Sequence, residues 1–148
     1  MRDGRPAMSV KSRTRQYGPA LQRLRAARLR PTRQRLALAY LLFERGDRHV
    51  SAEELHAEAA AARVTVSLAT VYNTLHQFIA AGLLREVVVA SGRSYFDTNV
   101  TQHHHFYHED SGALQDIAGT ELALPLLPRP PSGTAIARVD VIVRLRKL

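Results

Sequence analysis

Apolar residues recur at helical spacing along the first half of the chain, which predicts a series of amphipathic helices. A short helix is expected over residues 19–28. A longer helix is expected over residues 33–45, where Leu36, Ala39 and Phe43 form one apolar stripe.

Three polar residues stand at the expected starts of helices. Thr32 can cap the helix that follows it, because its side-chain oxygen can accept a hydrogen bond from an unpaired backbone N–H. Ser51-Ala52-Glu53-Glu54 is a capping box, which opens a helix that reaches about Ala62. Ser67 can cap a further helix that reaches about Ala81.

The helix over residues 67–81 has two distinct faces. Its apolar face consists of Leu68, Val71, Tyr72, Leu75, Phe78 and Ile79. Its polar face is short and uncharged, and consists of Thr70, Asn73, Thr74 and Gln77. Such a face is suited to base edges in DNA, because Asn can bond adenine and the methyl group of Thr can contact thymine. A solvated face that happens to be polar is the alternative.

The pattern changes to strands after this helix. Residues 84–89 and 94–97, joined by a turn at Ser91-Gly92, predict a β-hairpin. Three helices followed by a hairpin are the outline of a winged helix. The hairpin therefore completes a predicted DNA-binding domain.

The remaining third of the chain is expected to form short strands over residues 103–108, 113–117 and 138–146. Four prolines between residues 122 and 131 exclude an ordinary helix there. So few strands bury too little apolar surface alone, which predicts a homodimer.

The predicted fold class is α+β. A flexible basic arm is expected at residues 1–16, a winged-helix DNA-binding domain at 17–98, and a small β-rich (α/β) dimerisation and ligand-sensing domain at 99–148.

The net charge of +8 is unevenly distributed. Residues 1–48 contain 13 Lys or Arg against three acidic residues, whereas residues 49–148 contain eight against ten. A positive excess confined to the first third favours a polyanionic partner, since each Lys or Arg on a phosphate releases condensed counterions. A solvated basic tail is the alternative.

Arg30 and Arg33 stand beside the start of the second predicted helix. An arginine in the extended 29–31 linker could enter a minor groove, whereas the others would hold phosphates and set the register. Tyr72 lies at the edge of the apolar face, where its ring can pack while its hydroxyl reaches a phosphate or a base.

Four of the seven histidines lie within residues 103–108. On a strand, His103 and His105 point to one face and His104 points to the other. Two imidazoles on one face form half of a site for Zn, Fe or Mn, or an axial ligand pair for haem. A solvated edge strand is the alternative.

Asp97 and His49 are candidates for the remaining metal ligands. Both belong to the predicted DNA-binding domain, so a metal that joined them to His103 and His105 would fix the angle between the two domains. That angle would set the spacing of the two reading helices in a dimer, which must match half-sites about one DNA turn apart.

The composition excludes several classes to which the protein could belong. The chain has no cysteine, which excludes disulfides and a Cys-type structural zinc. No apolar run approaches the ~20 residues that span a bilayer, and the basic N-terminus lacks the apolar stretch of a secretory signal. A cytoplasmic location with no membrane partner is expected.

Three strings of residues together resemble the ferric uptake regulator family. They are Leu29-Arg30-Pro31-Thr32-Arg33-Gln34-Arg35, His49-Val50-Ser51-Ala52-Glu53-Glu54-Leu55 and Ser67-Leu68-Ala69-Thr70-Val71-Tyr72-Asn73-Thr74-Leu75. The resemblance implies a dimeric, metal-responsive repressor of a double-stranded DNA operator. It places DNA contacts at Arg30, Ser67, Thr70, Tyr72 and Asn73. It places the sensing metal at His49, Asp97, His103 and His105.

The chain also departs from the family's pattern. Asn73 stands where the family usually has Arg, and His108 and Ser111 replace the first Cys pair of its structural zinc. Gln102 and Arg138 stand where histidines of its second metal site are expected. A proline-rich segment replaces the long helix of its dimerisation domain.

These departures, with the His103–His105 triplet before Phe106-Tyr107 and the ending of the chain, look like the iron response regulator branch of the alphaproteobacteria. That branch implies that the triplet of His103, His104 and His105 binds haem. It also implies control of iron homeostasis, mainly by repression of haem-synthesis genes when iron is scarce.

Three alternatives stay open beside a haem- or iron-responsive repressor. The first is a family member that senses a bare divalent ion, Mn, Fe or Zn. The second is a small metalloenzyme, which the absence of a nucleophile, a phosphate loop and a carboxylate base near the triplet disfavours. The third is a nucleoid protein that binds all DNA sequences alike. The chain is therefore not expected to be an enzyme.

Overall fold

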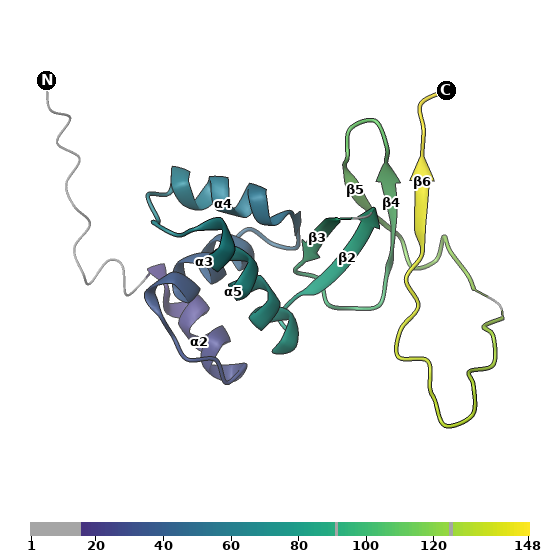
Figure 1. Ribbon diagram of the computed structural model, residues 1–148, viewed down its shortest axis with the longest axis horizontal. Helices are drawn as coiled ribbons and strands as arrows, with labels where there is room; N and C mark the ends of the chain where they lie inside the picture. The colour runs from purple at the N-terminus through teal and green to yellow at the C-terminus, as the bar shows by residue number, and fades with distance from the viewer. Residues whose placement is uncertain (1–15, 91, 125) are drawn as a thin grey trace, which may run out of the picture. The chain divides into compact units, whose positions relative to one another are not determined.

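The computed structural model describes residues 16–90, 92–124 and 126–148 (Figure 1). The chain divides into two compact units between Val100 and Thr101. Apart from Gln16, the predicted basic arm lies outside the described residues.

The first unit contains the four predicted helices, α2 (Gly18–Ala26), α3 (Arg33–Phe43), α4 (Ala52–Ala61) and α5 (Leu68–Ala80). Each predicted cap is confirmed. Thr32 accepts a hydrogen bond from the Arg35 N–H at 3.2 Å, and Ser51 forms the capping box with Glu54. Local sequence signals therefore determine where these helices begin.

The core of the first unit lies among these helices and the sheet beside them. Its largest fully buried side chains include Phe78, Phe96, Leu24, Leu38, Leu42, Leu55 and Leu75. The predicted stripe on α3 is wrong in detail, because Leu38 and Leu42 are fully buried while Leu36 and Phe43 are only partly buried. The reason is that α3 packs against both α2 and α4, so it is covered on more than one side.

Three antiparallel strands complete the first unit. The predicted hairpin is confirmed as β2 (Arg85–Ala90) and β3 (Arg93–Asp97), and a short strand, β1 (His49–Val50), pairs with the outer side of β3. β1 was not predicted, and its register sets His49 directly opposite Asp97.

The second unit is a three-stranded sheet of β4 (His104–His108), β5 (Leu114–Ile117) and β6 (Ile142–Leu145), in the order β5-β4-β6. β4 is antiparallel to β5 and parallel to β6. The last strand begins at Ile142, later than the predicted Arg138, because only the end of the alternating run pairs with β4.

No helix occurs in the second unit among the residues that the structure describes, in agreement with the prolines there. Several apolar side chains of this unit are exposed, among them Leu124, Leu126, Leu127 and Ile136. In the described parts of the chain, no helix is both long and apolar enough to cross a membrane.

Candidate metal centre and nucleic-acid interface

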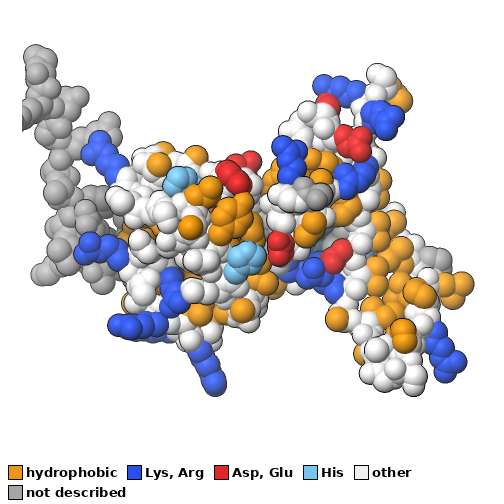
Figure 2. All heavy atoms as spheres, in the orientation of Figure 1, with side chains coloured by type: hydrophobic (Ala, Val, Ile, Leu, Met, Phe, Trp, Pro, Cys, Tyr) orange, Lys and Arg blue, Asp and Glu red, His pale blue; other side chains and the backbone are white. Residues whose placement is uncertain are grey.

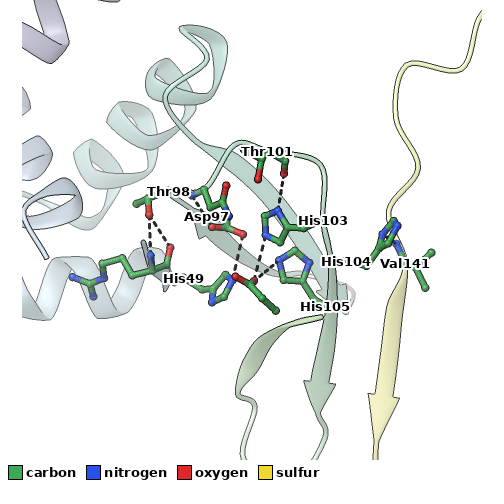
Figure 3. Close-up of polar contacts among 11 residues, drawn as sticks. His49, Asp97, Thr98, Thr101, His103, His104, His105 and Val141 are labelled. Atoms are coloured by element: carbon green, nitrogen blue, oxygen red, sulfur yellow. Dashed lines mark hydrogen bonds and ion pairs between the residues drawn. The ribbon is translucent and has the colours of Figure 1, made fainter. Parts of the chain in front are cut away.

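The first unit holds one imidazole and one carboxylate against each other. The Nε2 atom of His49 lies 3.3 Å from Oδ2 of Asp97, whose side chain is 1% exposed (Figure 3). Oδ1 of Asp97 accepts the Asn99 N–H at 2.9 Å. The Arg48 N–H donates to the Thr98 hydroxyl oxygen at 2.8 Å, which holds β1 at the end of β3. The strand pairing thus positions both side chains.

In the second unit, two imidazoles contact the same carboxylate. Nε2 of His103 and Nε2 of His105 each lie 3.3 Å from Oδ1 of Asp116 (Figure 3). Their rings are 4.5 Å apart, and the strand register places His105 directly opposite Asp116. Within this unit the three ligand atoms lie within 4.8 Å of one another.

The sequence did not identify Asp116 as a site residue. Its carboxylate lies beside His103 and His105, although no carboxylate base was expected near the histidine triplet. Its signal was the polar turn between β4 and β5, since that turn fixes which residue of β5 faces His105. A hairpin register counted from Gly112 identifies Asp116.

The hydrogen bond of the other His103 nitrogen shows that this cluster suits a cation. Nδ1 of His103 lies 2.6 Å from the carbonyl oxygen of Thr101. A carbonyl only accepts, so Nδ1 carries hydrogen, and Nε2 of a neutral ring then presents a lone pair to the Asp116 carboxylate. Two facing acceptors need a proton or a metal ion between them. Ligating histidines commonly donate their second N–H to a carbonyl in this way.

The third imidazole of the triplet points elsewhere. Nδ1 of His104 accepts the Val141 N–H at 3.1 Å on the opposite face of β4 (Figure 3). On that same face, Nε2 of His108 lies 3.1 Å from Oε1 of Gln115. Only His103 and His105 of the triplet therefore share a carboxylate.

The start of α5 presents the hydroxyls that the sequence singled out. The Thr70 N–H donates to Oγ of Ser67 at 3.1 Å, and the Ser67 hydroxyl donates to Oγ1 of Thr70 at 2.9 Å. Asn73 is exposed one turn later. Thr74 does not belong to this polar face, because it is only 5% exposed and lies on the packed side with Leu75.

Tyr72 bonds to the helix before α5. Its hydroxyl donates to Oε1 of Glu53 at 2.8 Å. This hydrogen bond raises the pKa of Tyr72 and lowers the pKa of Glu53, because it stabilises the protonated phenol and the ionised carboxylate together. Both groups lie at the surface, where the phenol hydroxyl stands beside the exposed side of α5.

Arg30 and Arg33 are exposed at the entry to α3. Arg35 ties this entry to α5, since its guanidinium donates to the Arg30 carbonyl at 2.8 Å and to Oε1 of Gln77 at 2.8 and 3.1 Å. The entry of α3 and the exposed side of α5 are therefore joined within the first unit.

The profile of the Ferric uptake regulator family matches residues 26–125, which is more than half of the chain. The chain belongs to the ferric uptake regulator family. A ferric uptake regulation protein of Shigella flexneri is 39% identical over 85 residues, 57% of this chain and 56% of that protein. The peroxide-responsive repressor PerR of Staphylococcus aureus strain Mu50 is 29% identical over 116 residues, 78% of each chain.

The solved structure of the ferric uptake regulator from Pseudomonas aeruginosa with manganese matches with a TM-score of 0.65. It is 26% identical, and the match covers 86% of this chain and 96% of that one. This likeness confirms the α+β fold class, with an N-terminal winged helix followed by a β-rich part. The chain spans only about half (56%) of the length of the Shigella flexneri relative.

Proposed function

We propose that this chain is a sequence-specific transcription regulator, mainly a repressor, that binds DNA as a homodimer and responds to a bound ligand. Family membership supports this proposal, as does the presence in one chain of a capped, exposed polar helix and of histidine–carboxylate clusters. The two relatives are named for regulation and repression, not for an enzymatic reaction. The protein would act in the cytoplasm, where DNA is accessible.

In this proposal the two units have separate tasks. Residues 17–98 form the DNA-binding domain, in which Ser67, Thr70, Tyr72 and Asn73 contact bases or phosphates and Arg30 and Arg33 contact the backbone or a minor groove. Residues 99–148 form the dimerisation and sensing domain. The observation that carries the assignment is the exposed polar side of α5, which begins at the Ser67 cap.

The ligand that the donor set fits best is one divalent ion of Mn, Fe or Zn. The proposed ligands are His49, Asp97, His103 and His105, with Asp116 as a fifth. Imidazole and carboxylate together suit these metals, and the chain offers no thiolate. The ion would supply positive charge that draws ligands of both domains onto one centre, and so fix their mutual angle.

The DNA assignment is tested with duplexes that the wild-type protein selects from a random pool. Tyr72→Ala is expected to weaken binding to the selected duplex more than binding to an unselected one, with unchanged dimerisation in sedimentation. Tyr72→Phe, which keeps the ring, separates the contribution of the hydroxyl. Wild-type affinity in Tyr72→Ala would show that α5 is not the reading helix.

Haem is the second candidate ligand. If the protein binds haem, the proposed targets are haem-synthesis and other iron genes. The observation that favours it is the density of imidazoles on β4, where His104 and His108 occupy the face opposite to His103 and His105. Haem added to the metal-free protein should shift its Soret band. The shift should be absent when His103, His104 and His105 are all changed to Ala. An unshifted band in the wild type would leave the divalent ion as the ligand.

A further inference from the structure

Each of the four helices of the first unit is followed by a residue with positive φ. After α3 and α5 this residue is Gly46 (φ 75°) and Gly82 (φ 78°), but after α2 and α4 it is Arg28 and Arg63, both at φ 58°. The left-handed region costs an L side chain conformational energy that glycine avoids. The chain therefore uses arginine at two positions where its own other helices use glycine.

The backbone geometry is the same in both cases. The Leu29 N–H donates to the Leu24 carbonyl at 2.9 Å around Arg28, and the Val64 N–H donates to the Ala59 carbonyl at 2.8 Å around Arg63. The same bond spans Gly82, from Leu83 to Phe78, at 2.9 Å. Glycine would thus serve the same turns, so the fold itself does not require arginine there.

Interactions within the fold do not account for the two side chains either. Both residues are exposed, and within the described part of the chain neither guanidinium has a hydrogen-bond or ion-pair partner. Figure 2 shows basic side chains standing out from the surface over the helical unit. Among the described residues, the intramolecular benefit that remains is the attraction of a cation to the C-terminal end of a helix, which is weak at an exposed site.

In sequence, both arginines lie next to segments of the predicted DNA-binding surface. Arg28 precedes the linker that carries Arg30 into α3, and Arg63 lies in the turn that leads to the Ser67 cap of α5. That turn is held in place, because Nε2 of His56 lies 3.0 Å from the Val66 carbonyl oxygen.

An open groove connects this turn with the start of α3. Its volume is about 660 Å³, and its lining includes Pro31, Thr32, Arg33, Ala62, Val64 and Thr65. Arg63 stands between two lining residues, and Arg33 is itself one of them. The start of α3 and the turn before α5 thus border one open groove, with Arg33 in its lining.

We propose that Arg28 and Arg63 bind phosphates of the duplex on either side of the bases that α5 reads. This inference rests on the proposed function. The strained backbone is tolerated because a fixed helix end presents the guanidinium to the phosphate with little loss of backbone freedom, and strain that the fold does not need commonly marks a functional position. These phosphate interactions carry charge and register but no sequence information.

The test compares Arg28→Gly, Arg63→Gly and the double variant with the wild type. Each Gly variant should unfold at a higher temperature, by about 2–4 °C for one relieved position, since the backbone strain is removed. Each should bind a random-sequence duplex and a selected duplex more weakly by the same factor. The slope of log K against log salt should fall by about 0.9 for every phosphate that the variant no longer neutralises.

Matched variants separate charge from backbone. Arg63→Lys should keep near-wild-type affinity, and Arg63→Asn, which is neutral but tolerates positive φ, should bind more weakly. Arg129→Gly removes an exposed arginine of the second unit and should change neither the salt slope nor the unfolding temperature.

Three results would overturn the inference. They are an unchanged salt slope in the Gly variants, a lower unfolding temperature in them, or an equal loss of affinity in Arg129→Gly. A wild-type protein that binds no duplex even at low salt would instead overturn the proposed function. If Tyr72→Ala abolishes selected binding while Arg28→Gly and Arg63→Gly bind as the wild type does, the proposed function holds and these two arginines bind no phosphate.

Discussion

Oδ1 of Asp116 lies 3.3 Å from the Nε2 atom of His103 and 3.3 Å from that of His105. The Nδ1–H of His103 donates to the carbonyl oxygen of Thr101, so Nε2 of a neutral His103 presents its lone pair to the carboxylate. At the residue scale this arrangement places either a proton or a metal ion between the imidazole and the carboxylate. It also explains why a single carboxylate on β5 is as important to the cluster as the histidines on β4.

Asp116→Asn is expected to weaken binding of Co²⁺, a visible substitute for Zn²⁺, by roughly tenfold or more, because an amide oxygen replaces a charged ligand. The measurement is a titration followed by the visible absorption of bound Co²⁺. Asp110→Asn is the control. Asp110 also lies in the second unit, but its partner is Lys147 at 3.0 Å. Equal affinities in Asp116→Asn and the wild type would remove Asp116 from the site.

Glu53→Gln tests the bond between α4 and α5. The carboxylate of Glu53 raises the pKa of Tyr72 by accepting its hydrogen, so the neutral amide should let the pKa of Tyr72 fall toward its ordinary value. The pKa is measured from the ring signals of labelled tyrosines as the pH rises past ~10. The ring signals of Tyr107, on β4, should have the same chemical shifts in both proteins at neutral pH. A Tyr72 that titrates as in the wild type would mean that the bond does not form in solution.

The residues of the site differed in how far the sequence could reveal them. His103 and His105 follow from strand alternation, and His49 and Asp97 were candidate ligands from the sequence that the family resemblance also indicates. Asp116 and the partner of Tyr72 did not follow, because each pairing depends on which residues a sheet register or a helix packing brings together. The pairing of Tyr72 with Glu53 depends on helix packing and leaves no local pattern, whereas the pairing of Asp116 with His105 follows once the turn fixes the hairpin register.

At the scale of elements, two serines perform the same structural task on different helices. Ser51 caps α4 and Ser67 caps α5, each by accepting a backbone N–H three residues on, at 3.1 Å. Only Ser67 lies at the start of the proposed reading helix. The pair therefore separates helix stability from DNA binding.

Ser51→Ala and Ser67→Ala should each lower the free energy of unfolding by about 1 kcal/mol, the usual cost of removing a cap. Only Ser67→Ala should also weaken binding to a selected duplex. Urea unfolding and fluorescence anisotropy with labelled duplex provide the two measurements. If DNA affinity fell equally in both variants, Ser67 would act through the helix alone.

The starts of α3, α4 and α5 were predictable because each is marked by a local capping residue, Thr32, Ser51 or Ser67. The hairpin was predictable from its turn. β1 was missed because two residues carry no period, and the late start of β6 was missed because its parallel pairing with β4 joins segments far apart in the chain. The burial around α3 depends likewise on its two neighbours.

For the whole molecule, the proposed division of metal ligands between the two units is the central feature. In the proposal, the first unit would provide His49 and Asp97, and the second would provide His103, His105 and Asp116. Two or three protein ligands alone leave a divalent transition metal open to water, whereas four or five enclose it. One ion shared by both sets would restrict the domains, and a dimer of restricted domains fixes the spacing of its two α5 helices.

The most direct test measures the affinity of the protein for duplex DNA with and without Mn²⁺. The duplexes are selected from a random pool by the wild-type protein, once in Mn²⁺ and once in EDTA. We expect Mn²⁺ to change the dissociation constant by a factor of about five or more, and saturating duplex to change the Mn²⁺ dissociation constant by the same factor, as linkage requires. His49→Ala should abolish both changes. Equal DNA affinities with and without Mn²⁺, in a wild-type protein shown to bind the ion, would contradict the account.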